Sequence, residues 1–159
     1  MVLFCCSLSA DQEITGLWKS RDDKSDKPRS LVVIYKYEDK YYGRMIATYD
    51  EEGKIQDTIL EKKDKAPGVV GNPPYCGMDF VYNIEEIRGN KYAGKIIDPQ
   101  KGKVYSAKLW RSGNDLIMRG EVFISGKNIR WPAASVKDLP KGFKMSEVKS
   151  FVPVVPQAM

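Results

Sequence analysis

The chain of 159 residues contains no histidine. Histidine is the commonest general base, the usual partner of a nucleophilic serine or cysteine, and the commonest metal ligand. The remaining acid–base groups are carboxylates, and none is placed in a working pair: Glu85 and Glu86 point to opposite faces of an extended run. Asp98 precedes Pro99, which is typical of a turn. We therefore expect no enzyme, no catalytic residue, no metal and no cofactor.

Cysteine is scarce, with three residues at Cys5, Cys6 and Cys76. This number and spacing do not fit a zinc site. If the N-terminal run that contains Cys5 and Cys6 is removed, Cys76 has no partner within the chain. A reactive Cys76 requires exposure near positive charge, and a buried free thiol is the alternative that we favour.

Long runs of apolar residues and long runs of basic residues are also missing. No apolar run approaches the roughly 18 residues that cross a bilayer, so we expect no transmembrane segment. The net charge is +5 and the isoelectric point is near 9.0, which leaves an anionic membrane or another polyanion as one interpretation. Basic residues alternate with acidic ones, as in 61–65, and this favours lysines that solvate the outer faces of strands. We expect no nucleic-acid partner.

Residues 77–110 organise the rest of the chain as three extended runs. The runs at 78–87, 91–97 and 103–110 are separated by turns at 88–90 and 98–102, which are rich in glycine, asparagine and proline. Apolar and aromatic side chains alternate with lysines along these runs. The pattern predicts an antiparallel meander with one face in a core and one face in water.

The same pattern repeats earlier in the chain, where residues 40–46 match residues 91–97 at a constant offset of 51. Gly43 and Gly94 fall in the middle of these runs and are expected to face the core, where a missing side chain lets a sheet bend or another group approach closely. The sequence predicts an all-β, single up-and-down antiparallel barrel of about 8–10 strands. The sole helical candidate is 56–65, and an open β-sandwich is the alternative fold.

Three regions follow from the composition. Residues 1–10 are a short apolar run ending in small residues, typical of the remnant of an export signal. Residues 11–133 form the expected barrel domain. Residues 134–159 contain three prolines without a clear period, and we expect a tail that wraps or frays. The least regular part of the barrel domain is the long loop at 49–77.

Several motifs together resemble a known family, the small exported bacterial proteins classified as domain of unknown function 2147. They are Gly16-Leu17-Trp18-Lys19, Tyr41-Tyr42-Gly43-Arg44-Met45, residues 92–99 followed by Gly102-Lys103-Val104-Tyr105, residues 116–120, and Gly126 with Trp131. The resemblance covers about residues 14–133. It implies a lipocalin-like (calycin) barrel with a central cavity and a periplasmic or secreted location, but no established activity. Many members carry a Cys-x-x-Cys pair in the long loop, where this chain has only Cys76.

Gly16-x-Trp18 also resembles the Gly-x-Trp of lipocalins. The resemblance implies that Trp18 closes one end of the barrel and that a late-strand arginine, Arg119 or Arg130, packs over its ring. The alternative is that Trp18 is an ordinary core residue.

Nine tyrosines suggest a lumen that binds a ligand, because a phenol offers an apolar body and a polar handle. The candidate lumen residues are Tyr41, Tyr82, Tyr92, Tyr105, Met45 and Phe80. The mouth is expected at the barrel end framed by residues 49–77, with Tyr75, Val69 and Val70 at its rim.

Three classes of function remain open. The first is binding of a small apolar or amphipathic ligand in the lumen, with the alternative that the tyrosines only pack the sheet. The second is a module with a filled core that binds a protein or the cell envelope through its surface. An enzyme is a distant third. The sequence does not decide the oligomeric state.

The first prediction concerns export. Because residues 1–10 end in small residues that suit a signal peptidase, the mature protein should lack this segment. An intact-mass measurement on protein purified from its native cell checks this, and a full-length chain recovered from the cytosol would contradict it.

Overall fold

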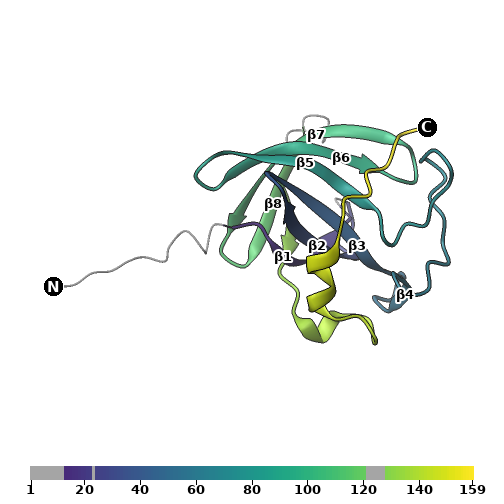
Figure 1. The fold of residues 1–159 in the computed structure, drawn as a ribbon. Coiled ribbons are helices and arrows are strands. Elements are labelled where there is room, and N and C mark those ends of the chain that lie inside the picture. The colour runs from purple at the N-terminus through teal and green to yellow at the C-terminus, as the bar shows by residue number, and fades with distance from the viewer. Residues whose placement is uncertain (1–12, 23, 121–127) are drawn as a thin grey trace.

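The computed structural model describes residues 13–22, 24–120 and 128–159. In these ranges the chain is mostly strand, with two short 3₁₀ helices and no helix long and apolar enough to span a bilayer (Figure 1). The elements are β1 (Gly16–Arg21), β2 (Pro28–Tyr37), β3 (Lys40–Tyr49), β4 (Ile55–Thr58), β5 (Asp79–Arg88), β6 (Lys91–Asp98), β7 (Lys103–Ser112), β8 (Asp115–Gly120), β9 (Ile129–Pro132), η3 (Val136–Asp138) and η4 (Met145–Ser150).

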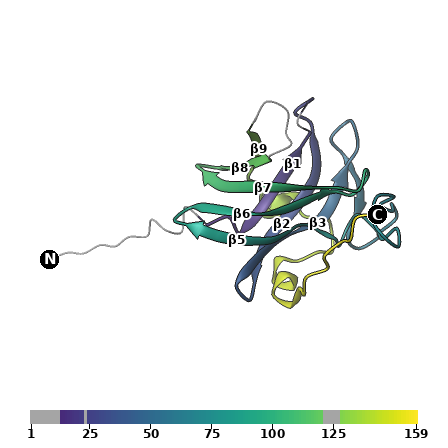
Figure 2. The same cartoon turned by 90° about the horizontal axis from the view of Figure 1, so that it is seen from above.

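The strands form one antiparallel sheet in the order β1-β2-β3-β5-β6-β7-β8-β9, with β4 paired to β3. A bridge between Trp18 and Ala133 joins the two ends of this sheet. The Ala134 N–H also donates a hydrogen bond of 2.9 Å to the Leu17 carbonyl. The sheet therefore curls into a nearly closed barrel (Figure 2), which confirms the predicted up-and-down barrel rather than the sandwich.

The connections divide the barrel into two ends. The hairpins β2–β3, β5–β6 and β7–β8 are short and lie at one end, here called the closed end. The connections at 21–28, 49–79 and 98–103 lie at the other, here called the open end. This arrangement follows from the alternating direction of antiparallel neighbours. The expected export signal at 1–10 and Gly126 of the family motifs lie outside the described residues.

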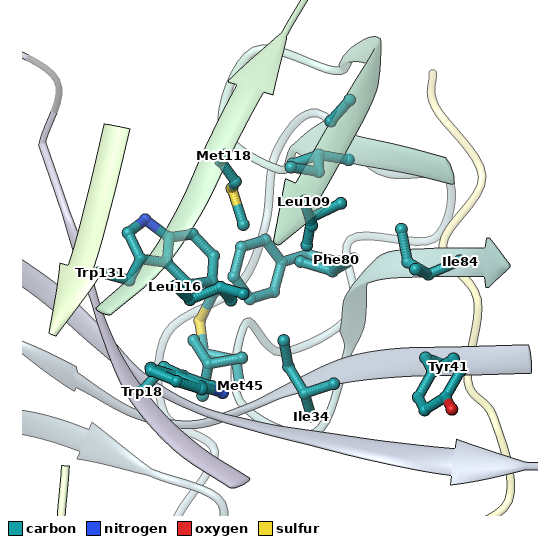
Figure 3. Packing of buried hydrophobic residues seen from close by; sticks show 14 of the residues in the cluster. Trp18, Ile34, Tyr41, Met45, Phe80, Ile84, Leu109, Leu116, Met118 and Trp131 are labelled. Atoms are coloured by element: carbon teal, nitrogen blue, oxygen red, sulfur yellow. The ribbon is translucent and has the colours of Figure 1, made fainter. Parts of the chain in front are cut away.

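Buried side chains fill the barrel near its closed end (Figure 3). Trp18 is only 1% exposed, and its indole N–H donates a hydrogen bond of 2.9 Å to the Ile14 carbonyl. Tyr41 and Tyr92 meet edge to face with ring centroids 5.2 Å apart. Such aromatic pairs add packing energy beyond the area that they bury. The closed end is therefore solid core.

Two glycines let adjacent strands approach closely, as the sequence predicts. A Cβ atom on Gly43 would lie 2.9 Å from the Val81 Cβ. A Cβ atom on Gly94 would lie 2.8 Å from both the Ile84 Cα and the Asn83 carbonyl oxygen. Because real Cβ atoms do not come this close to backbone, larger residues at these positions would push the strands apart.

The helix predicted at 56–65 is wrong. Residues 55–58 form β4, which pairs with the end of β3, and a turn follows. Asp57 is fully buried and its carboxylate accepts hydrogen bonds from the backbone N–H groups of Thr58, Lys63 and Asp64. These bonds hold the turn and lower the pKa of Asp57 although burial acts in the opposite direction.

The expected place of Tyr82 in the lumen, beside Phe80, also needs a correction. The register of β5 against β3 shifts between Asp79 and Val81, because Asp79 pairs with Arg44 and Val81 pairs with the neighbouring Gly43. An extra residue in a strand reverses the alternation of faces beyond it. Tyr82 is consequently half-buried and packs against both the barrel interior and the outer cluster described next.

Residues 133–159, here called the C-terminal strap, pack on the outside of β1, β2 and β3 (Figure 1). An outer cluster forms between the strap and these strands. Phe143 is buried in it, and the Phe151 ring meets the Tyr35 ring edge to face at 5.3 Å. The strap then runs on to the loop at 68–70, where Val69 bridges with Ala158.

A buried ion pair ties the strap to the barrel. The Arg44 guanidinium donates through Nε and Nη2 to the two carboxylate oxygens of Asp79, at 3.2 and 2.9 Å. Tyr35 donates to the same carboxylate at 2.9 Å. The strap completes the site, because the Val152 carbonyl accepts from Arg44 and the Val154 N–H donates to Asp79, both at 2.6 Å. Asp79 has no exposed surface, so its charge depends on these partners.

The second prediction tests this pair. Asp79→Ala should lower the free energy of unfolding by about 3 kcal/mol, because it leaves the Arg44 charge buried without its partner. Urea denaturation followed by circular dichroism measures the change. Asp115→Ala is the matched control, since it removes the exposed ion pair with Arg130 and should cost less than about 1 kcal/mol. Equal losses in the two variants would contradict the prediction.

Candidate ligand-binding cavity

A cavity of about 660 Å³ opens at the open end of the barrel. Its apolar wall is formed by side chains from five different strands: Met45 of β3, Phe80 of β5, Ile97 of β6, Tyr105 of β7, and Ile129 and Trp131 of β9. The rings of Phe80 and Trp131 lie 6.0 Å apart and are tilted by 31°. Figure 3 shows these two rings beside Met45, with Tyr41 on the far side of the cluster.

One wall of the cavity carries a row of three hydroxyl groups. Ser20, Ser30 and Thr48 stand opposite one another on β1, β2 and β3, and all three line the cavity. The Ser20 and Ser30 hydroxyls are hydrogen-bonded to each other. The Thr48 hydroxyl oxygen is buried and has no hydrogen-bond partner among the described residues. An unsatisfied buried polar atom is costly. This oxygen has almost no surface open to the cavity, so a ligand would reach it only after the Thr48 side chain rotates.

Charged side chains surround the mouth. The carboxylates there already accept hydrogen bonds: Asp98 from the N–H groups of Gln100 and Lys101, and Asp64 from the Gln56 amide. Among the described residues, the ammonium groups of Lys24 and Lys101 have no carboxylate within 4.0 Å, although both residues line the cavity. The mouth therefore offers two ammonium groups to an anionic group.

The expected lumen residues separate into three groups. Tyr105, Met45 and Phe80 line the cavity. Tyr41 and Tyr92 do not, because they pack against each other at the closed end. Burial raises the pKa of both phenols, so both stay neutral at physiological pH. Tyr82 is half-buried between the barrel interior and the outer cluster, and it does not line the cavity.

The expected rim is partly replaced. Tyr75 lines the cavity, within the predicted loop at 49–77. Val69 does not, since it is buried beneath the strap, and Val70 is half-exposed with its N–H bonded to the Gln157 carbonyl. Both valines therefore contact the strap instead of the cavity. No local sequence pattern indicates these contacts.

The sequence analysis did not find the hydroxyl row or Trp131. A register shift between Leu31 and Val32 places Ala47 and Met45 opposite consecutive residues of β2. This bulge reverses the faces, so Thr48 points inward three residues after Met45 rather than two or four. Simple alternation therefore misses Thr48. Trp131 had a visible signal, because it is a large aromatic residue before the strand-ending Pro132.

The arginine over Trp18 is a correction. Arg111 lies there, with its guanidinium carbon 5.4 Å from the centroid of the ring. It is held by hydrogen bonds to the carbonyls of Gly113 and Glu13. Of the two expected arginines, Arg119 is exposed and Arg130 forms an ion pair of 3.1 Å with Asp115.

Comparisons with known proteins agree with this architecture. The family described as "Uncharacterized protein conserved in bacteria (DUF2147)" matches residues 16–132. A solved structure, described as "Protein HP1028 from the human pathogen Helicobacter pylori belongs to the lipocalin family", superposes with a TM-score of 0.64 over 87% of this chain and 97% of that chain. The two chains are 20% identical, so the similarity shows a lipocalin-like fold alone. No curated protein matches the sequence.

The cysteine of the long loop, Cys76, is 1% exposed and unpaired. Burial raises the pKa of its thiol to about 12, and the nearby Asp57 and Asp64 carboxylates act in the same direction. Thiolate is the reactive form, so the Cys76 thiol has low reactivity in the folded protein.

The third prediction follows from this burial. In a Cys5→Ser/Cys6→Ser variant at pH 8, iodoacetamide should modify Cys76 at least about tenfold more slowly in the folded protein than in urea, because the folded thiol is both protonated and covered. Mass spectrometry of timed samples measures the rate. Modification at the same rate in both states would contradict the placement of Cys76.

Proposed function

Because this chain belongs to the DUF2147 family of uncharacterised bacterial proteins, whose description assigns no activity, we propose its function from its own cavity. The protein binds a small amphipathic ligand in the open end of its barrel. The observation that carries this proposal is the cavity of about 660 Å³ with an aromatic wall. This volume lies within the range of about 300–1,000 Å³ that is common for ligand sites, and the lining combines the aromatic wall with many polar and charged side chains.

The chemistry of the walls favours one orientation of the ligand. An apolar body packs against Phe80, Tyr105 and Trp131, where its contact surface is removed from water. A polar or anionic end lies towards the mouth, near the Thr48 hydroxyl and the Lys24 and Lys101 ammonium groups. A fatty acid or a similar chain with one charged end has this distribution.

A binding role is favoured over catalysis and over a filled, purely structural barrel. The chain has no histidine, and Asp64 and Asp98 at the mouth are engaged as hydrogen-bond acceptors. Such carboxylates are poorly placed to move protons. A module that acts through its surface alone has no use for an open lumen.

We also propose that the protein acts in the periplasm or outside the cell. The apolar run at 1–10, which ends in small residues, supports this location. The lumen would then carry or capture its ligand outside the cytoplasm.

The fourth prediction tests the cavity. A fluorescent fatty acid, anthroyloxy-labelled stearate, should bind the wild-type protein in a saturable way. Tyr105→Ala should weaken this binding about tenfold, because it removes one aromatic wall of the site. A fluorescence titration gives both dissociation constants.

The matched control is Tyr37→Ala. Tyr37 is also half-buried, but it packs in the outer cluster and does not line the cavity, so this variant should bind like the wild type. Circular dichroism verifies that both variants are folded. Absence of saturable binding to the wild-type protein, or equal weakening in the two variants, would overturn the proposal.

A further inference from the structure

The outer face of β6, β7 and β8 is strongly basic. Four exposed basic side chains belong to it: Lys91, Lys95, Lys108 and Arg119. The three strands are neighbours in the sheet, and Figure 2 shows them side by side on the part of the barrel away from the strap. This surface is here called the basic face.

The basic face lacks the acidic partners that usually neutralise such a surface. Lys108 and Arg119 stand directly opposite each other on β7 and β8. Like charges in that position destabilise a sheet. Among the described residues, neither side chain has a carboxylate within 4.0 Å, and Asp115 is already paired with Arg130.

The next carboxylate in the same row does not cancel this charge. Glu85 pairs with Ala93, and Ala93 pairs with Lys108. Glu85 is therefore separated from Lys108 by two strand spacings, or about 10 Å. At that distance water and salt screen most of the attraction. Lys108 and Arg119 therefore repel each other, and an anion bound from outside the protein would reduce this repulsion.

An aromatic and aliphatic edge adjoins the basic face at the closed end. The Lys91 ammonium lies 4.3 Å from the centroid of the Trp110 ring. Ile87, beside the tight β5–β6 turn, is 55% exposed. A groove of about 500 Å³ runs between these residues and is also lined by Arg88 and Lys108. A large apolar side chain at a hairpin tip, with tryptophan and basic groups around it, suits the boundary between lipid headgroups and acyl chains.

We propose that the basic face and its Ile87–Trp110 edge dock the protein on an anionic phospholipid bilayer. The lysines and Arg119 contact the phosphate groups, while Ile87 and Trp110 enter the interfacial layer. Attraction between basic residues and anionic headgroups supplies the long-range part of the binding. Because the edge lies at the closed end, the mouth of the ligand cavity points away from the docking edge and stays accessible. This inference does not depend on the proposed ligand.

The fifth prediction uses vesicles of phosphatidylglycerol and phosphatidylcholine. The protein should sediment with mixed vesicles at low salt, but not with pure phosphatidylcholine, and high salt should release it. Lys108→Glu/Arg119→Glu should reduce the bound fraction at least about tenfold, because two favourable charges become repulsive. Trp110→Phe should remove most of the quenching of tryptophan emission by brominated lipid, because Trp18 and Trp131 are buried.

Lys141→Glu/Lys149→Glu is the matched control, since it changes the net charge equally at exposed positions on the strap and should bind like the wild type. Circular dichroism establishes that every variant is folded. The proposal is overturned if the wild type does not bind anionic vesicles, or if the control pair loses as much binding as Lys108→Glu/Arg119→Glu. Persistent quenching in Trp110→Phe would also overturn it. Simultaneous binding of labelled stearate and vesicles would support a mouth that stays free.

Discussion

The buried pair between Arg44 and Asp79 connects the two parts of this molecule. It lies where β3 meets β5, and between these two strands the chain forms the long loop at 49–77. The same two side chains bond the backbone of the C-terminal strap at Val152 and Val154. A buried charge is stable only with its partners in place. The strap therefore covers the barrel wall and also completes the polar site within it.

This arrangement explains how the barrel is filled unevenly. The strap and the outer cluster stabilise β1, β2 and β3 from outside, with Tyr35 and Phe151 in contact. Inside, the closed end is packed with Trp18 and the Tyr41–Tyr92 pair. The open end does not have to be packed solid, because the fold draws stability from the closed end and from the outer layer. A cavity is tolerated where long connections leave room for it.

The bulges in β3 and β5 decide what the cavity can bind. They leave Tyr82 half-buried between the interior and the outer cluster, and they turn Thr48 inward. The result is a lumen with an aromatic wall on one side and hydroxyl groups on the other, rather than the ring of tyrosines expected from alternation. The strands of the basic face have no such bulge, because β6 and β7 pair without a register shift. There, alternation assigns the outward lysines correctly.

The sequence by itself determined the barrel and its strands apart from β4, since alternation, turn residues and the paired glycines Gly43 and Gly94 are local signals. It also determined which barrel end carries the long loops, because antiparallel order fixes the ends. Only the tertiary structure decided the faces beyond each bulge, the arginine over Trp18 and the place of the strap. These depend on contacts between residues far apart in the chain, such as Arg44 with Val152. No local pattern encodes such contacts, because the free energy that selects them arises only when the distant segments are packed together.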